Sequence, residues 1–350
     1  MAQRQASGLE DIWYGRARTW ARCLAPLSWL FAAIVALRKQ AYRAGWFKTH
    51  RAAVPVIVVG NLTVGGTGKS PLVAWLVTRL RERGLEPGIL TRGYGAKVQG
   101  AHRVTREARA AEVGDEALML ALQTGAPVVV APRRAEGAQL LEHDGVDCIV
   151  CDDGLQHLAL ARDLEIVVID AARGFGNGRL LPAGPLREPV QRISSVDYVA
   201  VQGARVDDSG TDVPRDWQGW HGTFAFELSP QQVVPVGART EAARPLASFA
   251  AGTVHAVAGI GHPARFFAAL RAAGLTIVEH PFPDHHAFRA ADFAFGDDLP
   301  VLMTAKDAVK CREFAEGRFW QVSVAARLEP DEGRALVDHV ERLVRAAQTR

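Results

Sequence analysis

Residues 56–80, VIVVGNLTVGGTGKSPLVAWLVTRL, decide the fold. A short β-branched apolar run predicts a buried strand, and the segment that begins at Ser70 has the apolar spacing of a helix. The glycine-rich loop between them ends Gly68-Lys69-Ser70, which fits the phosphate-binding pattern G-x-x-x-x-G-K-[ST]. Thr63 replaces the first glycine of that pattern, but other glycines in the loop keep the backbone flexible. The strand, loop and helix together predict a phosphate-binding site.

The loop predicts nucleotide binding, because small residues let successive backbone N–H groups point at phosphate oxygens. Lys69 would neutralise charge between the β- and γ-phosphates of ATP, and the Ser70 hydroxyl would ligate Mg²⁺. The residues expected to bind the nucleotide are Thr63, Val64, Gly65, Gly66, Thr67, Gly68, Lys69 and Ser70.

The most apolar stretch, CLAPLSWLFAAIVAL, covers residues 23–37 and lies between Arg22 and Arg38. It is shorter than the roughly 20 apolar residues of a membrane-spanning helix, and no cleavage site for a signal peptide follows. From residue 12 to residue 81 there is no acidic residue, and tryptophans and cations gather here as they do at a bilayer interface. We expect a membrane-associated helix rather than a buried one. Whether it enters one leaflet or spans the bilayer stays open, and its positive flanks place the body on the cytoplasmic side.

Strand and helix patterns alternate beyond the loop, which is typical of a parallel sheet covered by helices on both faces. We expect an α/β fold: a P-loop NTPase-like, mainly parallel sheet flanked by helices, with a smaller C-terminal α/β part and the N-terminal membrane-associated helix. A polar stretch at residues 206–218 marks a boundary. The expected domains are residues 1–51 (helix and basic linker), 52–205 (P-loop core) and 206–350 (the C-terminal part, closing a cleft).

An acidic pair ends the apolar run CIVCDDG, where Asp152 and Asp153 follow a predicted strand. Asp before Gly is common in turns, but adjacent carboxylates at a strand end are costly unless a cation balances them. Beside a phosphate loop, the pair indicates Mg²⁺ binding. Ser70 and Glu116 complete the expected magnesium ligands.

Overall charge and cysteine content narrow the class of protein. The net charge of +3 is too small to indicate nucleic-acid binding. The four cysteines are too scattered for a disulfide framework, which indicates a reducing compartment. Cys148 and Cys151 form a CxxC pair inside an apolar run without a second pair, so we expect strand-core residues rather than a zinc or redox site.

Other classes of P-loop protein fit less well. Membrane-partition ATPases carry an extra lysine where this chain has Val64, and the segment TAKD at residues 304–307 is not the guanine-reading N-K-x-D. A kinase for a small or lipid substrate remains. The alternative is a membrane-associated P-loop ATPase that acts as a switch on a protein partner.

Eight motifs follow one another in a family-specific order: VGNLTVGGTGKSP, TRGYG, VGDEALML, CDDGLQH, GFGNGRLLPAGPLREP, AGIGHPARFF, PDHHAF and TAKDAVK. Over nearly its whole length the chain resembles the tetraacyldisaccharide 4'-kinases, the lipid A 4'-kinases of Gram-negative bacteria. The resemblance implies transfer of the ATP γ-phosphate to the 4'-hydroxyl of a tetraacyldisaccharide 1-phosphate, with Mg²⁺, at the cytoplasmic face of the inner membrane. It implies a lipid-linked disaccharide and the membrane as partners, and neither nucleic acid nor a partner protein.

The resemblance also implies residue roles. Asp115, at a predicted helix start where carboxylates are common anyway, would be the general base. His285 of PFPDHHAF, rather than its neighbour His286, would orient it, so the two halves of the chain are expected to meet across a cleft. Lys306 is left as a structural residue. The residues expected near phosphates or substrate are Arg92, Arg133 or Arg134, Gln156, His157, Arg179 and Arg187.

Overall fold

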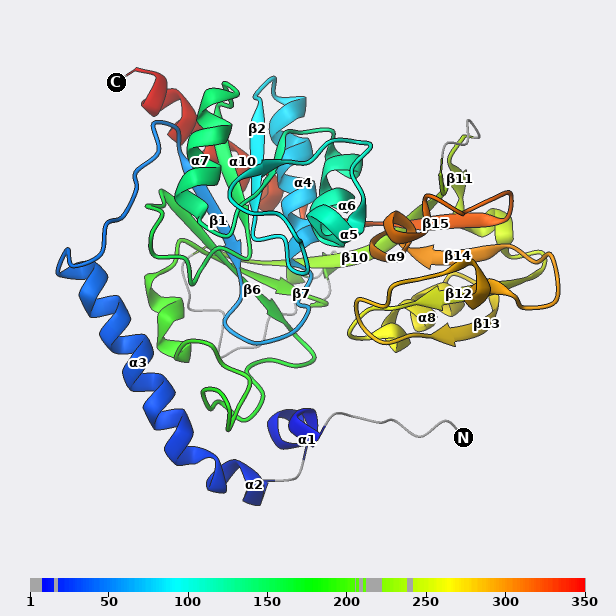
Figure 1. The fold of residues 1–350 in the computed structure, drawn as a ribbon, viewed down its shortest axis with the longest axis horizontal. Coiled ribbons are helices and arrows are strands. Elements are labelled where there is room, and N and C mark those ends of the chain that lie inside the picture. The colour runs from blue at the N-terminus through cyan, green and yellow to red at the C-terminus, as the bar shows by residue number, and fades with distance from the viewer. Residues whose placement is uncertain are drawn as a thin grey trace. The chain divides into compact units, whose positions relative to one another are not determined.

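The computed structural model describes residues 8–15, 18–204, 206–207, 210–211, 222–237 and 242–349 (Figure 1). The chain forms two compact units, each built from separate segments. The first unit contains residues 1–69, 147–227 and 328–350, and the second contains residues 70–146 and 228–327. Most of the polar stretch 206–218, like residues 1–7, lies outside the described residues.

The first unit is built on parallel strands in the order β7-β6-β1-β5. β1 (Val56–Gly60) is fully buried and pairs with β5 (Cys148–Asp152) on one side and β6 (Leu164–Asp170) on the other. β7 (Tyr198–Gln202) pairs with β6 and with the first part of β10 (Thr223–Pro235). Strands buried on both faces need continuous apolar runs, which is why these segments lack polar alternation. α10 (Pro330–Gln348) closes the chain.

The CxxC pair lies inside β5, where both cysteines are buried. Burial raises the pKa of Cys148 to about 12, so its thiol stays protonated at neutral pH. The expectation of strand-core cysteines is confirmed.

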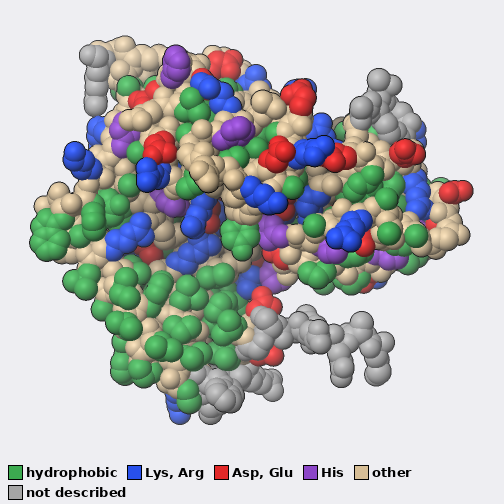
Figure 2. Space-filling model, in the orientation of Figure 1, with side chains coloured by type: hydrophobic (Ala, Val, Ile, Leu, Met, Phe, Trp, Pro, Cys, Tyr) green, Lys and Arg blue, Asp and Glu red, His purple; other side chains and the backbone are tan. Residues whose placement is uncertain are grey.

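Three helices begin the first unit: α1 (Gly8–Tyr14), α2 (Arg18–Cys23) and α3 (Ala25–Arg43). α3 exposes large apolar side chains at helical spacing, and Figure 2 shows hydrophobic side chains gathered over it. They are Leu27, Trp29, Leu30, Ile34 and Leu37. In the described part of the chain, no helix has both the length and the apolar character needed to cross a membrane.

The second unit contains two groups of strands. The first has the order β2-β4-β3, with β2 (Pro87–Thr91) and β4 (Val128–Val130) parallel and β3 (His102–Arg103) antiparallel. The helices in this part of the chain are α4 (Lys69–Glu82), α5 (Ala110–Val113), α6 (Asp115–Thr124) and α7 (Arg134–His143), of which α4 starts at the last residue of the first unit's segment.

The second group has the order β13-β12-β14-β15-β10 and is parallel from β13 to β15. Phe267, Trp320 and their neighbours form its core. Its strands are β12 (Thr253–Ala258), β13 (Thr276–Pro281), β14 (Val301–Thr304) and β15 (Phe319–Leu328), with the short β11 (Arg244–Pro245) on β10. Its helices are α8 (Pro263–Ala272) and α9 (Ala305–Cys311), with 3₁₀ turns at Leu246–Phe249 and Ala290–Phe293.

The expected α/β fold is confirmed: the sheets are mainly parallel and helices flank them. β10 was not predicted from the sequence, because Pro230 and two glutamines interrupt its apolar pattern. The domain ranges 1–51, 52–205 and 206–350 stay a prediction. Asp115 and His285, expected on different halves of the chain, belong to the same compact unit.

Candidate functional site

The glycine-rich loop is tied to the end of β1 through Asn61. Asn61 is fully buried, and its Nδ2 donates to the carbonyl of Gly65 at 3.2 Å. Lys69 Nζ in turn donates to Asn61 Oδ1 at 3.0 Å. Gly65 and Gly68 adopt φ values of 106° and 85°, which disfavour any side chain. The loop and its lysine are therefore held in shape by a residue that the sequence analysis did not single out.

Asp153 lies between two cations. Arg187 Nη1 is 3.0 Å from each of its carboxylate oxygens, and Lys69 Nζ is 3.7 Å from Oδ1. Asp153 has a φ of 53°, a left-handed conformation that costs free energy in a non-glycine residue and often marks a functional site. Asp152, one residue earlier, is buried at the end of β5. The structure thus brings Lys69, Asp153 and Arg187 together.

Residues 174–189, GFGNGRLLPAGPLREP, form a Gly/Pro-rich loop that packs against the phosphate loop. Val64 N donates to the carbonyl of Pro185 at 2.8 Å, and Arg187 N donates to that of Leu62 at 2.6 Å. Gln156 Oε1 accepts from Arg187 Nη1 at 3.2 Å. Gln156 and Arg187 therefore lie beside the phosphate loop. Gln156 was expected there because it follows the Asp pair closely, whereas Arg187 was expected to meet the substrate, which stays a prediction.

Arg173 is a residue near the loop that the sequence analysis missed. Its guanidinium lies so close to Gly65 that a Cβ on that glycine would be 2.9 Å from Nη1. The guanidinium carbon lies 4.2 Å from the ring centroid of Tyr14, and Nη2 is 3.5 Å from Glu10 Oε1. One sequence feature could have pointed to Arg173, namely its position just after the apolar run that forms β6, the neighbour of β1. Ligand sites gather at the carboxyl ends of parallel strands.

The remaining residues predicted to meet substrate have varied surroundings. Arg92 and Arg179 are exposed. Arg133 pairs with Glu136 at 2.9 Å on the surface, whereas Arg134 is buried and donates to the carbonyl of Ala131 at 3.0 Å. The carbonyl of His157 accepts from Arg162 Nη2 at 2.7 Å. Their contact with substrate stays a prediction.

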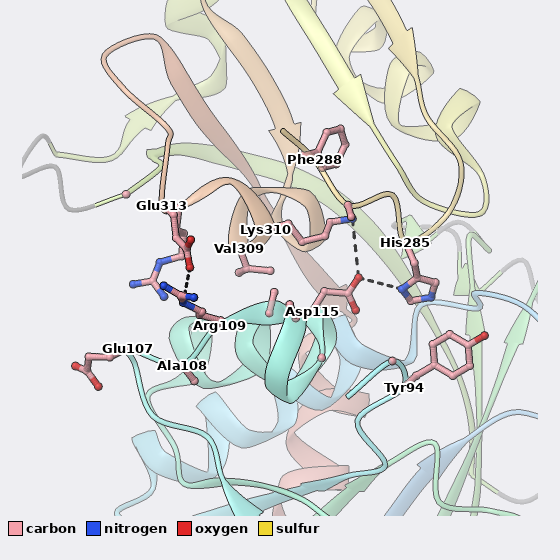
Figure 3. Close-up of a pocket in the computed structure, with 17 residues that line it drawn as sticks. Tyr94, Glu107, Ala108, Arg109, Asp115, His285, Phe288, Val309, Lys310 and Glu313 are labelled. Atoms are coloured by element: carbon pink, nitrogen blue, oxygen red, sulfur yellow. Dashed lines mark hydrogen bonds and ion pairs between the residues drawn. The ribbon is translucent and has the colours of Figure 1, made fainter. Parts of the chain in front are cut away.

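Asp115 and His285 contact each other within the second unit. His285 Nδ1 lies 3.0 Å from Asp115 Oδ2, and Asp115 Oδ1 accepts from the backbone N–H of Glu116 at 2.9 Å (Figure 3). Asp115 is buried at the first position of α6. His285 has a φ of 59°, and in the described part of the chain only it and Asp153 combine a positive φ with a side chain.

His286 points elsewhere. Its Nε2 lies 3.0 Å from Asp292 Oδ2, and its ring packs against Phe282 and Phe288. Of the two neighbouring histidines, His285 is therefore the partner of Asp115, as expected from the sequence.

A cavity of about 540 Å³ opens beside the Asp115–His285 pair (Figure 3). Tyr94 and Lys310 line it, together with the Arg109–Glu313 ion pair, whose closest atoms are 2.8 Å apart. An open cavity with both charged and apolar side chains next to a carboxylate–histidine pair suits the binding of a hydroxyl-bearing ligand.

Glu116, the further expected magnesium ligand, lies 3.3 Å from Lys306 Nζ. The described residues contain no group of three or more His, Cys, Asp or Glu side chains arranged to hold a metal ion.

Comparisons with known proteins agree on one family. The family model described as tetraacyldisaccharide-1-P 4'-kinase (LpxK) matches residues 20–342. Tetraacyldisaccharide 4'-kinase of Alkalilimnicola ehrlichii is 49% identical over 93% of this chain and 94% of its own length. The protein of that name from Xanthomonas campestris pv. campestris is 48% identical over 92% of each chain. The crystal structure of LpxK from Aquifex aeolicus in complex with ATP has a TM-score of 0.77 at 28% identity, covering 93% of this chain and 99% of that one.

Proposed function

This chain belongs to the tetraacyldisaccharide-1-P 4'-kinase family, and we propose that it transfers the γ-phosphate of ATP to the 4'-hydroxyl of a tetraacyldisaccharide 1-phosphate in lipid A biosynthesis. The observation that carries the proposal is the Asp115–His285 contact of 3.0 Å beside a cavity, in a chain that also holds Lys69 in a phosphate loop. A kinase for a sugar hydroxyl needs both a phosphate-binding loop and a base.

ATP binds at the phosphate loop in this proposal. Backbone N–H groups of residues 63–70 hold the phosphates, and Lys69 offsets the charge that builds up between the β- and γ-phosphates. The relative from Aquifex aeolicus was crystallised with ATP, which supports this role. Lys69 already contacts Asn61 and Asp153, so its ammonium is positioned before the phosphates arrive.

The Ser70 hydroxyl and the carboxylates of Asp152 and Asp153 would hold Mg²⁺. These are the hard oxygen ligands that Mg²⁺ prefers, and the strained backbone of Asp153 fits a ligand position. When bound, Mg²⁺ neutralises phosphate charge and orients the γ-phosphate. Arg187, 3.0 Å from Asp153, keeps that carboxylate oriented and supplies a second charge for phosphate groups.

Asp115 acts as the general base. A sugar hydroxyl is a poor nucleophile, and a carboxylate within hydrogen-bond reach takes its proton as the phosphoryl group arrives. His285 contacts Asp115 Oδ2, whereas Asp115 Oδ1 accepts one hydrogen bond from the backbone N–H of Glu116. A carboxylate oxygen has two lone pairs, so Oδ1 keeps one for the hydroxyl of the acceptor sugar. The cavity beside the pair offers room for the acceptor sugar.

The exposed apolar side of α3 rests on the inner membrane at its cytoplasmic face. An acceptor with four acyl chains stays in the bilayer, so the enzyme has to reach it there. The apolar side chains of α3, followed by Arg38, Lys39 and Arg43, have the composition of an interfacial helix on anionic lipid.

Transfer of labelled γ-phosphate tests the function. We expect ATP consumption only with tetraacyldisaccharide 1-phosphate in mixed micelles, and one 4'-phosphorylated product for each ATP consumed. The matched control is the 4'-deoxy form of the same lipid, which should support no consumption. Equal ATP consumption with the 4'-deoxy lipid, or without lipid, would overturn the proposal and favour an ATPase that acts on a protein partner.

A further inference from the structure

α9 presents two lysines one helical turn apart, and both reach the Asp115–His285 pair. Lys310 Nζ lies 4.0 Å from Asp115 Oδ2, the oxygen that also contacts His285 (Figure 3). Lys306 Nζ lies 3.4 Å from His285 Nε2. Residues four apart lie on one side of a helix, so both lysines point toward the Asp115–His285 pair. Lys310 is near Asp115, and Lys306 is near His285.

Lys310 is held in place by Asp307 and Phe288. Its Nζ forms an ion pair with Asp307 Oδ1 at 2.8 Å and lies 5.0 Å from the ring centroid of Phe288. Asp307 is fully buried, and its Oδ2 accepts from the backbone N–H of Gly259 at 2.9 Å and from the Thr304 hydroxyl at 2.7 Å. With so little water around it, the attraction of this ammonium for Asp115 is weakly screened.

Lys306 constrains the ring of His285. An ammonium group only donates hydrogen bonds, so a neutral ring accepts at Nε2 and carries its proton on Nδ1, facing Asp115. Lys306 Nζ also lies 3.3 Å from Glu116 Oε1 and 3.5 Å from Asp284 Oδ1, two carboxylates that hold the ammonium group beside the ring.

We propose that Lys306 and Lys310 are positioning residues of the Asp115–His285 pair. Lys306 fixes the His285 ring with its proton on Nδ1, and Lys310 holds the Asp115 carboxylate against that proton. This inference rests on the proposed role of Asp115 as the base. Lys310 lines the cavity offered to the acceptor, but the role proposed here acts through Asp115, because a misplaced base costs rate even when both substrates bind normally.

The purely structural alternative is that the lysines only offset the charges of Asp307, Glu116 and Asp284. In that case their loss lowers stability but changes neither the proton position on His285 nor the turnover of the folded enzyme. The proton position therefore separates the two roles.

Nitrogen-15 NMR of the His285 ring in the full-length enzyme measures that position without any turnover. We expect a neutral ring protonated on Nδ1 in the wild type, and a shift toward the Nε2-protonated form in Lys306→Met. The exposed Lys97→Met is the matched control and should change nothing. A wild-type ring protonated on Nε2, or a His285 signal that Lys306→Met leaves unchanged, would overturn the inference.

Steady-state kinetics test Lys310. We expect Lys310→Met to lower kcat by about 10- to 100-fold, the range for a displaced catalytic group, with the KM for ATP nearly unchanged. Lys310→Arg should recover most of the loss because it keeps the charge. The exposed Lys97→Met is the control and should leave kcat unchanged. Wild-type kcat in folded Lys310→Met would refute the role of Lys310.

Asp115→Asn separates this inference from the proposed function. Full activity of that variant would remove Asp115 as the base, and the NMR measurement would still decide where the ring proton lies. An inactive Asp115→Asn beside fully active lysine variants would refute the positioning role alone.

Discussion

Lys69 contacts two groups that hold its ammonium over the glycine-rich loop, Asn61 and Asp153. We predict that Lys69→Ala lowers kcat by about 10³-fold or more, because its charge stabilises phosphates during transfer. The fold should survive, since Asn61 keeps its bond to Gly65. Turnover assays beside thermal unfolding measure both effects. Near-normal turnover in folded Lys69→Ala would remove the loop from the mechanism.

Asp115 and His285 offer the sharpest test at a single pair of residues. We predict that Asp115→Ala lowers kcat by about 10²–10⁴-fold, as expected for a lost general base, while ATP affinity changes little. The losses from Asp115→Ala and His285→Ala should not add, because either change disables the same unit.

A double-mutant cycle on kcat with tetraacyldisaccharide 1-phosphate measures this coupling. Fully additive losses would mean that Asp115 and His285 act independently, and the pair would have to be abandoned as a unit. A loss confined to ATP affinity would recast Asp115 as a nucleotide contact. His286→Ala is the matched control and should leave kcat unchanged, since His286 pairs with Asp292.

At the scale of elements, β12 and β13 each contribute one histidine to a contacting pair, of which His255 is buried and His280 is half-buried. His255 Nδ1 lies 2.9 Å from His280 Nε2, and His255 Nε2 lies 2.9 Å from Asp297 Oδ1. Phe295 stacks on the His280 ring with centroids 3.9 Å apart. Burial, and next the neighbouring His255, lower the pKa of His280 below its ordinary value.

The lowered pKa of His280 predicts a pH dependence of stability. In the unfolded chain, His280 has a pKa of about 6.5 and binds a proton below that pH, whereas in the folded protein it stays neutral to a lower pH. The unfolded chain therefore binds more protons in this range, and the free energy of unfolding rises with pH. The contribution of His280 to stability is fully present above its unfolded pKa and is lost as the pH falls through its lower folded pKa. We expect the free energy of unfolding to increase from pH 5 to pH 7, and His280→Phe to flatten the increase.

Denaturant unfolding across this pH range measures the effect. His102→Asn, which changes an exposed histidine, is the control and should keep the wild-type slope. An unchanged slope in His280→Phe would show that other groups cause the dependence.

Most elements were predictable from local pattern. The buried strands β1, β5 and β6 are continuous apolar runs, and α6 starts at an acidic pair and ends before a glycine. β10 was not predictable, because its pairing with β7 and β15 outweighs a local sequence that contains proline.

At the scale of the whole molecule, the proposed membrane attachment depends on α3. We predict that Leu30→Ser, Ile34→Ser and Leu37→Ser combined strongly reduce binding to anionic vesicles, because they remove exposed apolar area. ATP binding should persist. Deletion of residues 1–37 should also release the protein, but it would disturb the Gly/Pro-rich loop too, since Ser28 Oγ donates to Leu180 O at 2.9 Å.

Vesicle cosedimentation and turnover in bilayers measure attachment. Val278→Ser, a change at an exposed apolar residue of β13, is the control and should leave binding intact. A triple variant that still binds vesicles would place attachment elsewhere, for example in the basic run 38–51.

The sequence by itself determined the elements that local chemistry dictates. Lys69 and Asp153 were found because each lies in a motif whose neighbours are adjacent in the chain: a glycine loop and a strand end. Asp115 stands at a predicted helix start, but its role as the base was implied only by the resemblance to the family. Apolar periodicity identified the α/β class for the same reason, since each element is stabilised by its own pattern.

Only the tertiary structure decided which distant side chains meet. Arg173 comes close to Gly65, and Lys310 Nζ lies 4.0 Å from Asp115 Oδ2, although the residues of each pair stand far apart in the sequence. Such contacts arise from packing, so no local pattern indicates them. A buried charge is stable only where packing provides its partner, so these pairings could not be predicted from any single segment.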